Sequence, residues 1–507
     1  MNKYILALDL GTTSAKCMVF NKNGVPVGKA ARTLECSYPR EGFVEQSPDQ
    51  LFETIKGSAL EAILSARTIA SHIAAIGISV QRETVILWDR NTGKAVTDAY
   101  SWQCNRGAAR INALTEEERE MIRSKTGLIP SPYFSASKIA WALDNIPGLR
   151  ARAEAGEIAF GTPDSWLIYK LSGGKAYLTD HTNASRTMLF NIDRLEWDKE
   201  LLELFDIPEA MLPEIKPSIG YFAETDTSLF GRPIPVFGSA GDQQCALFGQ
   251  RCFLPGDMKI TYGTGSFMLM NTGTGRPVSE NGLLTTVAVS DDMGGAEYAR
   301  EGSIFMCGAL LKWLRDKLGI IKDPKETSSV AESLPDNGGV YMVPALTGLG
   351  APYWKNDVKG LIAGLSLDTD RRHIVRAALE GIAFQSMDIL KVMESSSGGH
   401  IGKVKTDGGV SKNDFLMRFL ANVTGVDVIR PKFAESTAMG AAFMAGLGCG
   451  FWSSKDALDR LEEKTDVFEP DKDELWRKKQ ICGWEQAVRS NYEICTHSRS
   501  ASRDAHI

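Results

Sequence analysis

Four short turns, rich in glycine and small hydroxyl residues, have the composition of a phosphate-binding site. They lie at residues 9–16, 238–244, 261–266 and 407–413, each after a predicted strand. The backbone N–H groups of such turns, with nearby serine and threonine hydroxyls, can bind the oxygens of a terminal phosphate. Alone, the first two turns are about equally compatible with a ligand site and with a plain turn or a helix cap, and a plain hairpin is the more common outcome for the third. Four of them in succession predict one cleft that binds a phosphorylated ligand.

Two aspartates in these turns have the chemistry that phosphoryl transfer needs. Asp9 ends the first predicted strand, where its carboxylate can hold a hydrated Mg²⁺ ion. Asp242 lies among small residues, where it can accept a proton from an attacking hydroxyl group. The alternative for Asp242 is the N-cap of a helix. The alternative for the first turn is a tight connection between two strands.

Arg82 and Glu83 directly follow a predicted apolar strand at residues 74–80. One interpretation is a polyol site, in which the guanidinium donates to substrate hydroxyls and the carboxylate accepts from them. The other is an ion pair at a strand end. Three aromatic residues in turn-rich contexts are candidates for an apolar pocket wall or, more commonly, for the core: Trp102, Tyr133 and Phe267.

The elements that must position these residues alternate between strands and helices. Residues 4–9, 17–21 and 25–30 are predicted strands, and Asn23-Gly24 is a turn between the last two. A long helix follows, with Ser47 as its N-cap and a proline in its first position. This pattern predicts an α/β fold.

The order of strands and glycine turns begins again near residue 250. The turn at Asp407 follows a strand as the turn at Asp9 does, so we predict two related α/β units that meet at a cleft. The expected domains are residues 1–250, with the polyol site and a phosphate turn, and residues 251–492, with the nucleotide site. We expect a frayed tail at residues 493–507.

Composition excludes several other classes of protein. The 507 residues include 57 Lys and Arg against 63 Asp and Glu, a net charge of −6, which disfavours nucleic acid as a main partner. No apolar run approaches the roughly 20 residues of a membrane span. Nine scattered cysteines, with no Cys-x-x-Cys pair, fit reduced thiols in a cytoplasmic protein. The Walker and Gly-x-Gly-x-x-Gly motifs are absent.

Longer strings of sequence carry a resemblance to a known family. From about Tyr4 to Asn491 the chain resembles the FGGY carbohydrate kinases, and within them the members that phosphorylate glycerol. The strings that carry it are residues 81–84, 132–136, 164–168, 182–187, 241–244, 261–267 and 282–286.

The resemblance implies two actin-like, ribonuclease-H-like domains flanking a catalytic cleft. It implies ATP- and Mg²⁺-dependent phosphorylation of glycerol to sn-glycerol 3-phosphate, with Asp242 as general base and the metal near Asp9 and Asp242. The implied glycerol contacts are Arg82, Glu83, Trp102, Tyr133, Asp242, Gln243 and Phe267. The implied nucleotide contacts are Thr12, Thr13, Ser14, Lys16, Thr264, Gly308, Lys312, Gly409 and Asn413.

The chain departs from the usual pattern of those members at Leu10, Lys16, Asn105 and Lys312. A kinase for another polyol or for a ketose such as xylulose is therefore the alternative. An actin-like ATPase with a conformational output is a more remote one, against which the Arg82-Glu83 pair and the aromatic residues argue. We expect a homodimer or a homotetramer.

Overall fold

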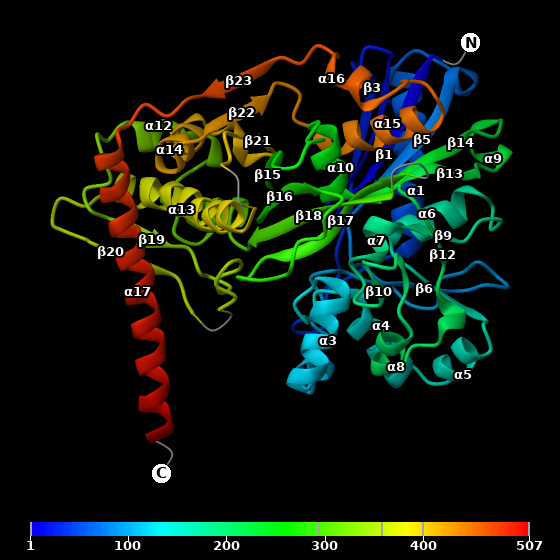
Figure 1. Cartoon of the computed structure of the whole chain (residues 1–507), viewed down its shortest axis with the longest axis horizontal. Coiled ribbons are helices and arrows are strands. Elements are labelled where there is room, and N and C mark those ends of the chain that lie inside the picture. Colours follow the sequence, from blue (N-terminus) through cyan, green and yellow to red (C-terminus); the bar gives the residue numbers. More distant parts are fainter. Residues whose placement is uncertain (1–2, 292–294, 356–357, 398–399, 505–507) are drawn as a thin grey trace.

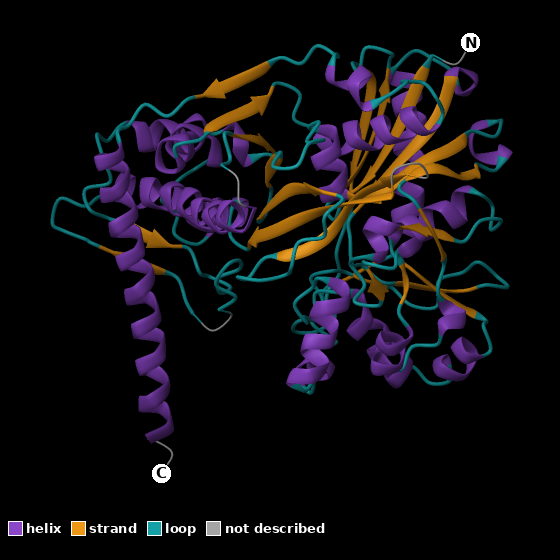
Figure 2. Ribbon diagram, viewed as in Figure 1, coloured by secondary structure: helices purple, strands orange, loops and turns teal. Residues whose placement is uncertain are grey.

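The computed structural model describes residues 3–291, 295–355, 358–397 and 400–504, and it is built around one mixed sheet of 13 strands. Helices cover both faces of this sheet (Figures 1 and 2). The strand order is β23 (Thr465–Phe468), β22 (Asp427–Pro431), β21 (Lys403–Asp407), β15 (Met258–Tyr262), β16 (Ser266–Gly273), β18 (Gly295–Ile304), β17 (Leu284–Asp291), β13 (Ile219–Glu224), β14 (Pro235–Gly241), β5 (Ile73–Val80), β1 (Tyr4–Leu10), β2 (Ser14–Phe20) and β3 (Pro26–Thr33).

The two halves of the sheet repeat one pattern. In the N-terminal half β1, β2 and β3 form an antiparallel meander, and β5 and β14 continue it as parallel strands beside β1. In the C-terminal half β15, β16 and β18 form the meander, and β21 and β22 are the parallel strands beside β15. This repetition agrees with the predicted pair of related α/β units.

In the described part of the chain, seventeen α-helices surround the sheet and form the outer parts of the molecule. They are α1 (Pro48–Ser65), α2 (Ala108–Asn112), α3 (Glu116–Thr126), α4 (Ser135–Asn145), α5 (Leu149–Glu154), α6 (Pro163–Leu171), α7 (His181–Ala184), α8 (Lys199–Phe205), α9 (Thr227–Phe230), α10 (Asp242–Gly249), α11 (Gly308–Asp316), α12 (Thr327–Glu332), α13 (Arg371–Ser397), α14 (Asp414–Thr424), α15 (Ser436–Gly448), α16 (Lys455–Asp459) and α17 (Glu474–Asp504). Among the helices described, none is long and apolar enough to cross a membrane.

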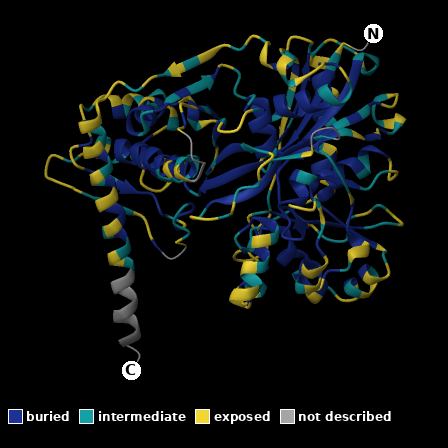
Figure 3. Cartoon of the chain, in the orientation of Figure 1, coloured by how far each residue is buried: buried dark blue, intermediate teal, exposed yellow. Residues whose placement is uncertain are grey.

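Short two-stranded ribbons complete the fold outside the main sheet. They pair β4 (Glu45–Gln46) with β7 (Ala99–Tyr100), β6 (Ile86–Asp89) with β8 (Ile158–Gly161), β9 (Leu178–Asp180) with β12 (Glu214–Lys216), β10 (Phe190–Asn191) with β11 (Glu196–Trp197), and β19 (Tyr341–Val343) with β20 (Leu361–Ala363). Burial is concentrated in the strands of the main sheet, whereas outer helices such as α3 are exposed (Figure 3).

Local signals in the sequence were largely sufficient to predict the N-terminal strands and the start of α1. The three predicted strands are β1, β2 and β3, and the side chain of Ser47 accepts a hydrogen bond from the Gln50 N–H as the N-cap of α1. Gly173 and Gly174 lie between helix α6 and strand β9. Both glycines have positive φ, but they follow the end of helix α6 and do not join two strands.

The C-terminal helix is longer than predicted. Helix α17 continues to Asp504, beyond Tyr492, where we expected it to end in a frayed tail. Residues 493–504 contain neither glycine nor proline, so no residue in that stretch forces the helix to stop. Figure 1 shows α17 extending along one side of the molecule, away from the sheet.

Helices α10 and α15 cross at the centre of the molecule with almost no space between their backbones. A Cβ atom on Gly440 of α15 would lie 1.9 Å from the Cys245 carbonyl oxygen of α10. A Cβ atom on Gly249 of α10 would lie 2.0 Å from the Ser436 carbonyl oxygen. Both positions therefore require glycine, because the atoms that a side chain would meet belong to the backbone and cannot move alone.

Replacement of Gly440 by alanine tests this crossing. Alanine favours helix by about 1 kcal/mol over glycine, yet we expect Gly440→Ala to destabilise the fold by about 1–3 kcal/mol through overpacking. The measurement is the free energy of unfolding in urea. Gly402→Ala is the control, since a Cβ atom there meets nothing within 4 Å. Equal stability of the two variants would contradict the packing argument.

Candidate active site

Asp9 and Asp242 lie at the same edge of the sheet because their strands share a neighbour. Strand β5 runs parallel to both β1 and β14, and Ser79 of β5 is opposite Asp9 on one side and Ala240 on the other. Asp242 follows Ala240 by two residues and is the first residue of α10. The carboxyl ends of parallel strands thus bring the two aspartates together, the usual place for a site in an α/β sheet.

The segment 238–242 differs from its prediction as a glycine turn. Strand β14 continues through it to Gly241, and α10 begins at once. Gly238 is small because α15 packs on it: a Cβ atom would lie 2.8 Å from the Ala445 nitrogen. The N-cap of α10 is Gly241, so Asp242 is not the cap. One carboxylate oxygen of Asp242 accepts from the Gln243 N–H at 2.8 Å.

Asp9 is a buried carboxylate, and among the described residues no lysine or arginine forms an ion pair with it. Its side chain accepts a hydrogen bond from the Ser79 hydroxyl at 3.1 Å, and the residue is 7% exposed. Burial raises the pKa of Asp9 to about 7; the charge of Lys16 lowers it and the charge of Asp242 raises it further. A carboxylate in this position favours a bound cation.

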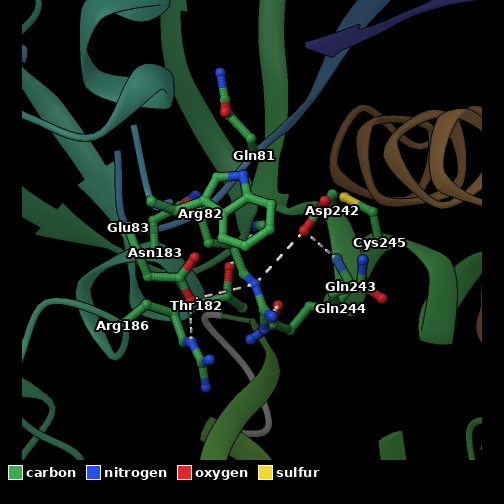
Figure 4. A network of polar contacts seen from close by, with 12 residues as sticks. Gln81, Arg82, Glu83, Thr182, Asn183, Arg186, Asp242, Gln243, Gln244 and Cys245 are labelled. Carbon is green, nitrogen blue, oxygen red and sulfur yellow. Dashed lines mark hydrogen bonds and ion pairs between the residues drawn. The ribbon is translucent and has the colours of Figure 1, made fainter. Parts of the chain in front are cut away.

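Arg82 and Glu83 belong to a network of four buried charges (Figure 4). Two nitrogens of Arg82 donate to Glu301 at 2.6 and 3.0 Å. Arg186 donates to the same Glu301 at 2.9 Å and also to Glu83 at 2.6 Å. All four side chains are at most 2% exposed. Although burial opposes ionisation, the charges of Arg186 and Arg82 lower the pKa of Glu301 to about 2.

The network shows that Arg82 and Glu83 are not simply paired with each other. Their closest approach is 3.6 Å, and each has a shorter contact with another partner, so the two do not form a simple pair. The remaining Nε of Arg82 lies 3.5 Å from the Asp242 carboxylate. Glu83 has φ of 63° within a turn closed by a hydrogen bond from the Thr84 N–H to the Arg82 carbonyl. Such strained turns are concentrated at functional sites.

The three aromatic candidates are only partly buried, unlike core residues. The rings of Trp102 and Tyr133 meet edge to face at 5.5 Å between centroids, and the Arg82 guanidinium lies 5.9 Å from the Phe267 ring. The indole N–H of Trp102 donates to the Thr12 hydroxyl at 2.8 Å. That bond ties the aromatic residues to the first phosphate turn.

The turn at Thr264 and the start of α11 form one unit. The Thr264 carbonyl accepts from the N–H groups of Cys307 at 3.1 Å and Ala309 at 3.0 Å. A Cβ atom on Gly308 would lie 2.6 Å from the Gly263 carbonyl oxygen, so glycine is needed for this approach. Lys312 is exposed and lies one helical turn after Gly308. The structure therefore brings these three nucleotide candidates to one end of α11.

The turn after β21 packs against the carboxyl end of strand β15, at Tyr262. Gly408 has φ of 89°, and a Cβ atom there would lie 2.4 Å from the Tyr262 carbonyl oxygen. Gly409 beside it faces open space, with nothing within 4 Å of a built Cβ. The Asn413 side chain is engaged within the protein, since it caps α14 through the Leu416 N–H and donates to Thr327, each at 2.9 Å.

The remaining candidates lie on the N-terminal hairpin. The Thr13 carbonyl accepts from the Leu34 N–H at 2.9 Å, and Ser14 closes the turn by accepting from the Gly11 N–H at 3.0 Å. The ammonium of Lys16 is bonded to Glu435 at 2.7 Å, a contact between residues 419 positions apart. Lys16 thus joins this hairpin to the start of α15.

Sequence reasoning missed three charged residues of the site: Arg186, Glu301 and Lys259. Arg186 was present in one of the strings that carried the family resemblance, but its partners are more than 100 residues away. Glu301 lies within strand β18, although Gly302 and Ser303 directly after it favour a turn by residue type. A charged residue in the middle of an otherwise buried strand is the signal that was available for Glu301 and for Lys259 of β15.

Comparison with known proteins decides the family. The N-terminal and C-terminal domains of the FGGY family of carbohydrate kinases match residues 4–249 and 258–449. The chain belongs to the FGGY family of carbohydrate kinases. Curated FGGY relatives include a glycerol kinase of Shewanella amazonensis, 49% identical over 96% of this chain and 98% of the relative, and a glycerol kinase of Clostridium botulinum with the same identity and coverage.

Solved structures of FGGY kinases have the same fold. The crystal structure of Plasmodium falciparum glycerol kinase with ADP matches with a TM-score of 0.90 and 35% identity over 96% of this chain and 98% of that one. A ligand-bound xylulose kinase from Lactobacillus acidophilus matches with a TM-score of 0.83 and 22% identity over 98% of each chain, which supports the fold alone.

Replacement of Arg186 by methionine tests the buried charge network. Without its cation, Glu83 and Glu301 are left buried and under-neutralised. We therefore expect Arg186→Met to lower the free energy of unfolding by about 3–5 kcal/mol. The measurement is denaturant unfolding at neutral pH. Arg315→Met is the control, because that exposed arginine pairs only with exposed Asp316, and no measurable change is expected. A loss of stability at Arg186 no larger than at Arg315 would contradict the network's role.

Proposed function

We propose that this FGGY kinase transfers the γ-phosphoryl group of ATP to glycerol and releases ADP and sn-glycerol 3-phosphate. The observation that carries the proposal is the position of Asp242. Its carboxylate lies 3.5 Å from Arg82, beside the buried charge network and at the strand edge that also holds Asp9. The glycerol kinases that the chain resembles over nearly its whole length support the choice of polyol.

In this proposal glycerol is bound by polar groups with fixed roles. Arg82 donates to substrate hydroxyls, and Glu83 accepts from them. Tyr133 and Gln243 contribute further hydrogen bonds, while Trp102 and Phe267 form the apolar wall. Because Arg186 and Glu301 hold the charged pair in place, the site is organised before the substrate arrives.

Asp242 acts as the general base of the proposed reaction. It accepts the proton of the attacking hydroxyl, whose oxygen forms a bond to the γ-phosphorus as the bond to the leaving ADP oxygen breaks. Burial raises the pKa of Asp242, while the charges of Arg82 and Lys259 oppose that rise. The carboxylate is therefore more basic than an exposed aspartate and is still held close to two cations.

The proposed nucleotide site uses the turns at both strand edges. Thr12, Thr13, Ser14 and Lys16 on one side and Thr264 on the other would contact the phosphates. Gly308, Lys312, Gly409 and Asn413 would contact the rest of the nucleotide. The open space above Gly409 and the close approach at Gly308 support this placement. Closure of the cleft around ATP would exclude water and limit hydrolysis.

The chemistry of Asp9 and Asp242 fits a Mg²⁺ ion. The two carboxylates are close enough for the charge of Asp242 to raise the pKa of Asp9. Within the residues described, no group of three or more His, Cys, Asp or Glu side chains could hold a metal. A site with few protein ligands is what Mg²⁺ favours, because it keeps water and phosphate oxygens as ligands. When bound, Mg²⁺ would neutralise charge on the transferred group.

The domain boundary, assembly and location are also part of the proposal. We place the polyol site in residues 1–250 and the nucleotide site in residues 251–492, supported by the two family matches at 4–249 and 258–449. We infer a cytoplasmic homodimer or homotetramer. A kinase for xylulose is the second candidate, but the xylulose kinase structure supports only the fold, whereas glycerol kinases match at 49% identity.

Asp242→Asn tests the general base. The amide keeps the shape of the side chain but cannot accept the proton, so kcat should fall by about 10²- to 10⁴-fold. Glycerol binding should survive, because Arg82 and Glu83 remain. A coupled assay of ADP release measures kcat, and Asp368→Asn on an exposed loop is the control. More than a tenth of wild-type turnover in Asp242→Asn would place the base elsewhere.

Phe267→Ala tests the choice of substrate. The apolar wall should close the pocket around a three-carbon chain, so the wild-type ratio of kcat/KM for glycerol to that for D-xylulose should be far above one. Removing the ring should lower this ratio roughly tenfold or more. It should also raise the KM for glycerol more than the KM for ATP. Phe468→Ala, on the edge strand β23, is the control. A wild-type ratio below one would overturn glycerol but not the kinase assignment.

A further inference from the structure

Lys259 is a fully buried cation at the base of the proposed site, and the mechanism above gives it no role of its own. It lies on β15 and is 0% exposed. Its ammonium donates to the side-chain oxygen of Gln243 at 2.5 Å and to the Thr261 hydroxyl at 2.8 Å. Burial of an ammonium costs free energy unless the ammonium is paired, so a lysine at this buried position calls for a structural or functional reason.

Two carboxylates keep Lys259 charged. Burial lowers its pKa to about 8, and the charges of Asp407 and Asp242 oppose that effect. Asp407 lies directly opposite Thr261 on the neighbouring strand β21. It is 3% exposed, and one of its carboxylate oxygens accepts from Gln250 at 2.9 Å. The ammonium therefore lies among acceptors and negative charge, as a buried lysine requires.

The contact fixes the orientation of the Gln243 amide. An ammonium has three donors and no acceptor, so only the amide oxygen of Gln243 can face it. In the described part of the chain, nothing accepts a hydrogen bond from the amide nitrogen of Gln243, which remains available as a donor. Next to it, the Asp242 carboxylate is an acceptor, held by the Gln243 backbone N–H at 2.8 Å.

We propose that Lys259 is a positioning residue that turns Gln243 into a hydrogen-bond donor for the substrate hydroxyl beside Asp242. A hydroxyl that gives its proton to Asp242 needs a donor to its oxygen and not a second acceptor. Without Lys259, the amide of Gln243 is free to present its oxygen instead, and that oxygen would compete with the Asp242 carboxylate as acceptor for the hydrogen of the substrate hydroxyl. This inference rests on the proposed function and deepens it.

The contact also links the two segments that the family matches define. Lys259 lies in the C-terminal match, 258–449, and Gln243 lies in the N-terminal match, 4–249. The orientation of the Gln243 amide, which would face the polyol, is therefore fixed by a residue in the half of the chain that would bind the nucleotide. Figure 4 shows Gln243 following Asp242 at the start of α10, directly beside the charge network.

A double-mutant cycle tests whether Lys259 acts through Gln243. The variants are Lys259→Met, Gln243→Ala and both together, and the readouts are the dissociation constant for glycerol measured by calorimetry without ATP and the KM for ATP. We expect each single variant to weaken glycerol binding about tenfold or more. The double variant should be no weaker than Gln243→Ala alone, because both changes remove one interaction. The KM for ATP should stay within about twofold.

The matched control is Lys405→Met. Lys405 is opposite Lys259 on the neighbouring strand and donates to the Gln250 carbonyl, away from Gln243. It should leave the affinity for glycerol unchanged. If Lys259→Met does not fold, Lys259→Ala takes its place in the cycle, since alanine leaves room for water beside Asp407 and, like methionine, cannot donate to Gln243.

Three outcomes would overturn the inference. They are glycerol affinity in the Lys259 variant within about twofold of wild type, a double variant weakened by the product of the two single effects, or equal losses for glycerol and ATP. Failure of the proposed function looks different, because the wild-type protein would then prefer another polyol. In that case the same cycle with the preferred polyol tests Lys259 independently.

Discussion

The buried network of Arg82, Glu301, Arg186 and Glu83 is the constraint on which the site depends. Its charges alternate in sign, and its side chains are at most 2% exposed. Such networks contribute little net stability, because desolvation offsets most of the attraction, but loss of a single member is costly. Their value is geometric: with two nitrogens bound to Glu301, Arg82 can present only its Nε toward Asp242.

The sheet supplies the second constraint by repeating one pattern twice. In each half a meander is followed by parallel strands, so an acidic or glycine-rich turn follows the equivalent strand in both halves. The turn after β1 and the turn after β15 thereby occupy related positions. Duplication of a simple unit produces a cleft with two sides that can each bind part of one ligand.

What could be predicted from the sequence was what depends on near neighbours. The hairpin of β1 and β2, the N-cap at Ser47 and the turn at Thr264 follow from local residue types. Gly238 was recognised as unusual but was given the wrong reason, because its cause is a helix 200 residues away. Helix α17 continues to Asp504 through the residues expected to be a frayed tail, and nothing in their local sequence forces it to stop.

The partners of Arg82 and Glu83 are too distant in the sequence to be predicted from local residue types. The contact of Arg82 with Glu301 spans 219 positions, and that of Arg186 with Glu83 spans 103. A pair of adjacent opposite charges cannot reveal whether its members bind each other or distant partners, because the answer depends on tertiary packing. The resemblance to the family implied a role for Arg82 and Glu83, but only the structure shows that their nearest charged partners are Glu301 and Arg186.

The contacts between the two halves of the chain differ greatly in what it costs to break them. Arg82 with Glu301 is a buried ion pair, so separating it leaves a charge without its partner, at several kcal/mol. Separating Lys259 from Gln243 leaves a buried ammonium without one of its acceptors. Lys16 and Glu435 are each 34% exposed, and water can replace their contact at a cost of at most about 1 kcal/mol. The contact between the halves that costs least to break is therefore the one at Lys16, whereas the buried contacts of Arg82 and Lys259 hold the halves together.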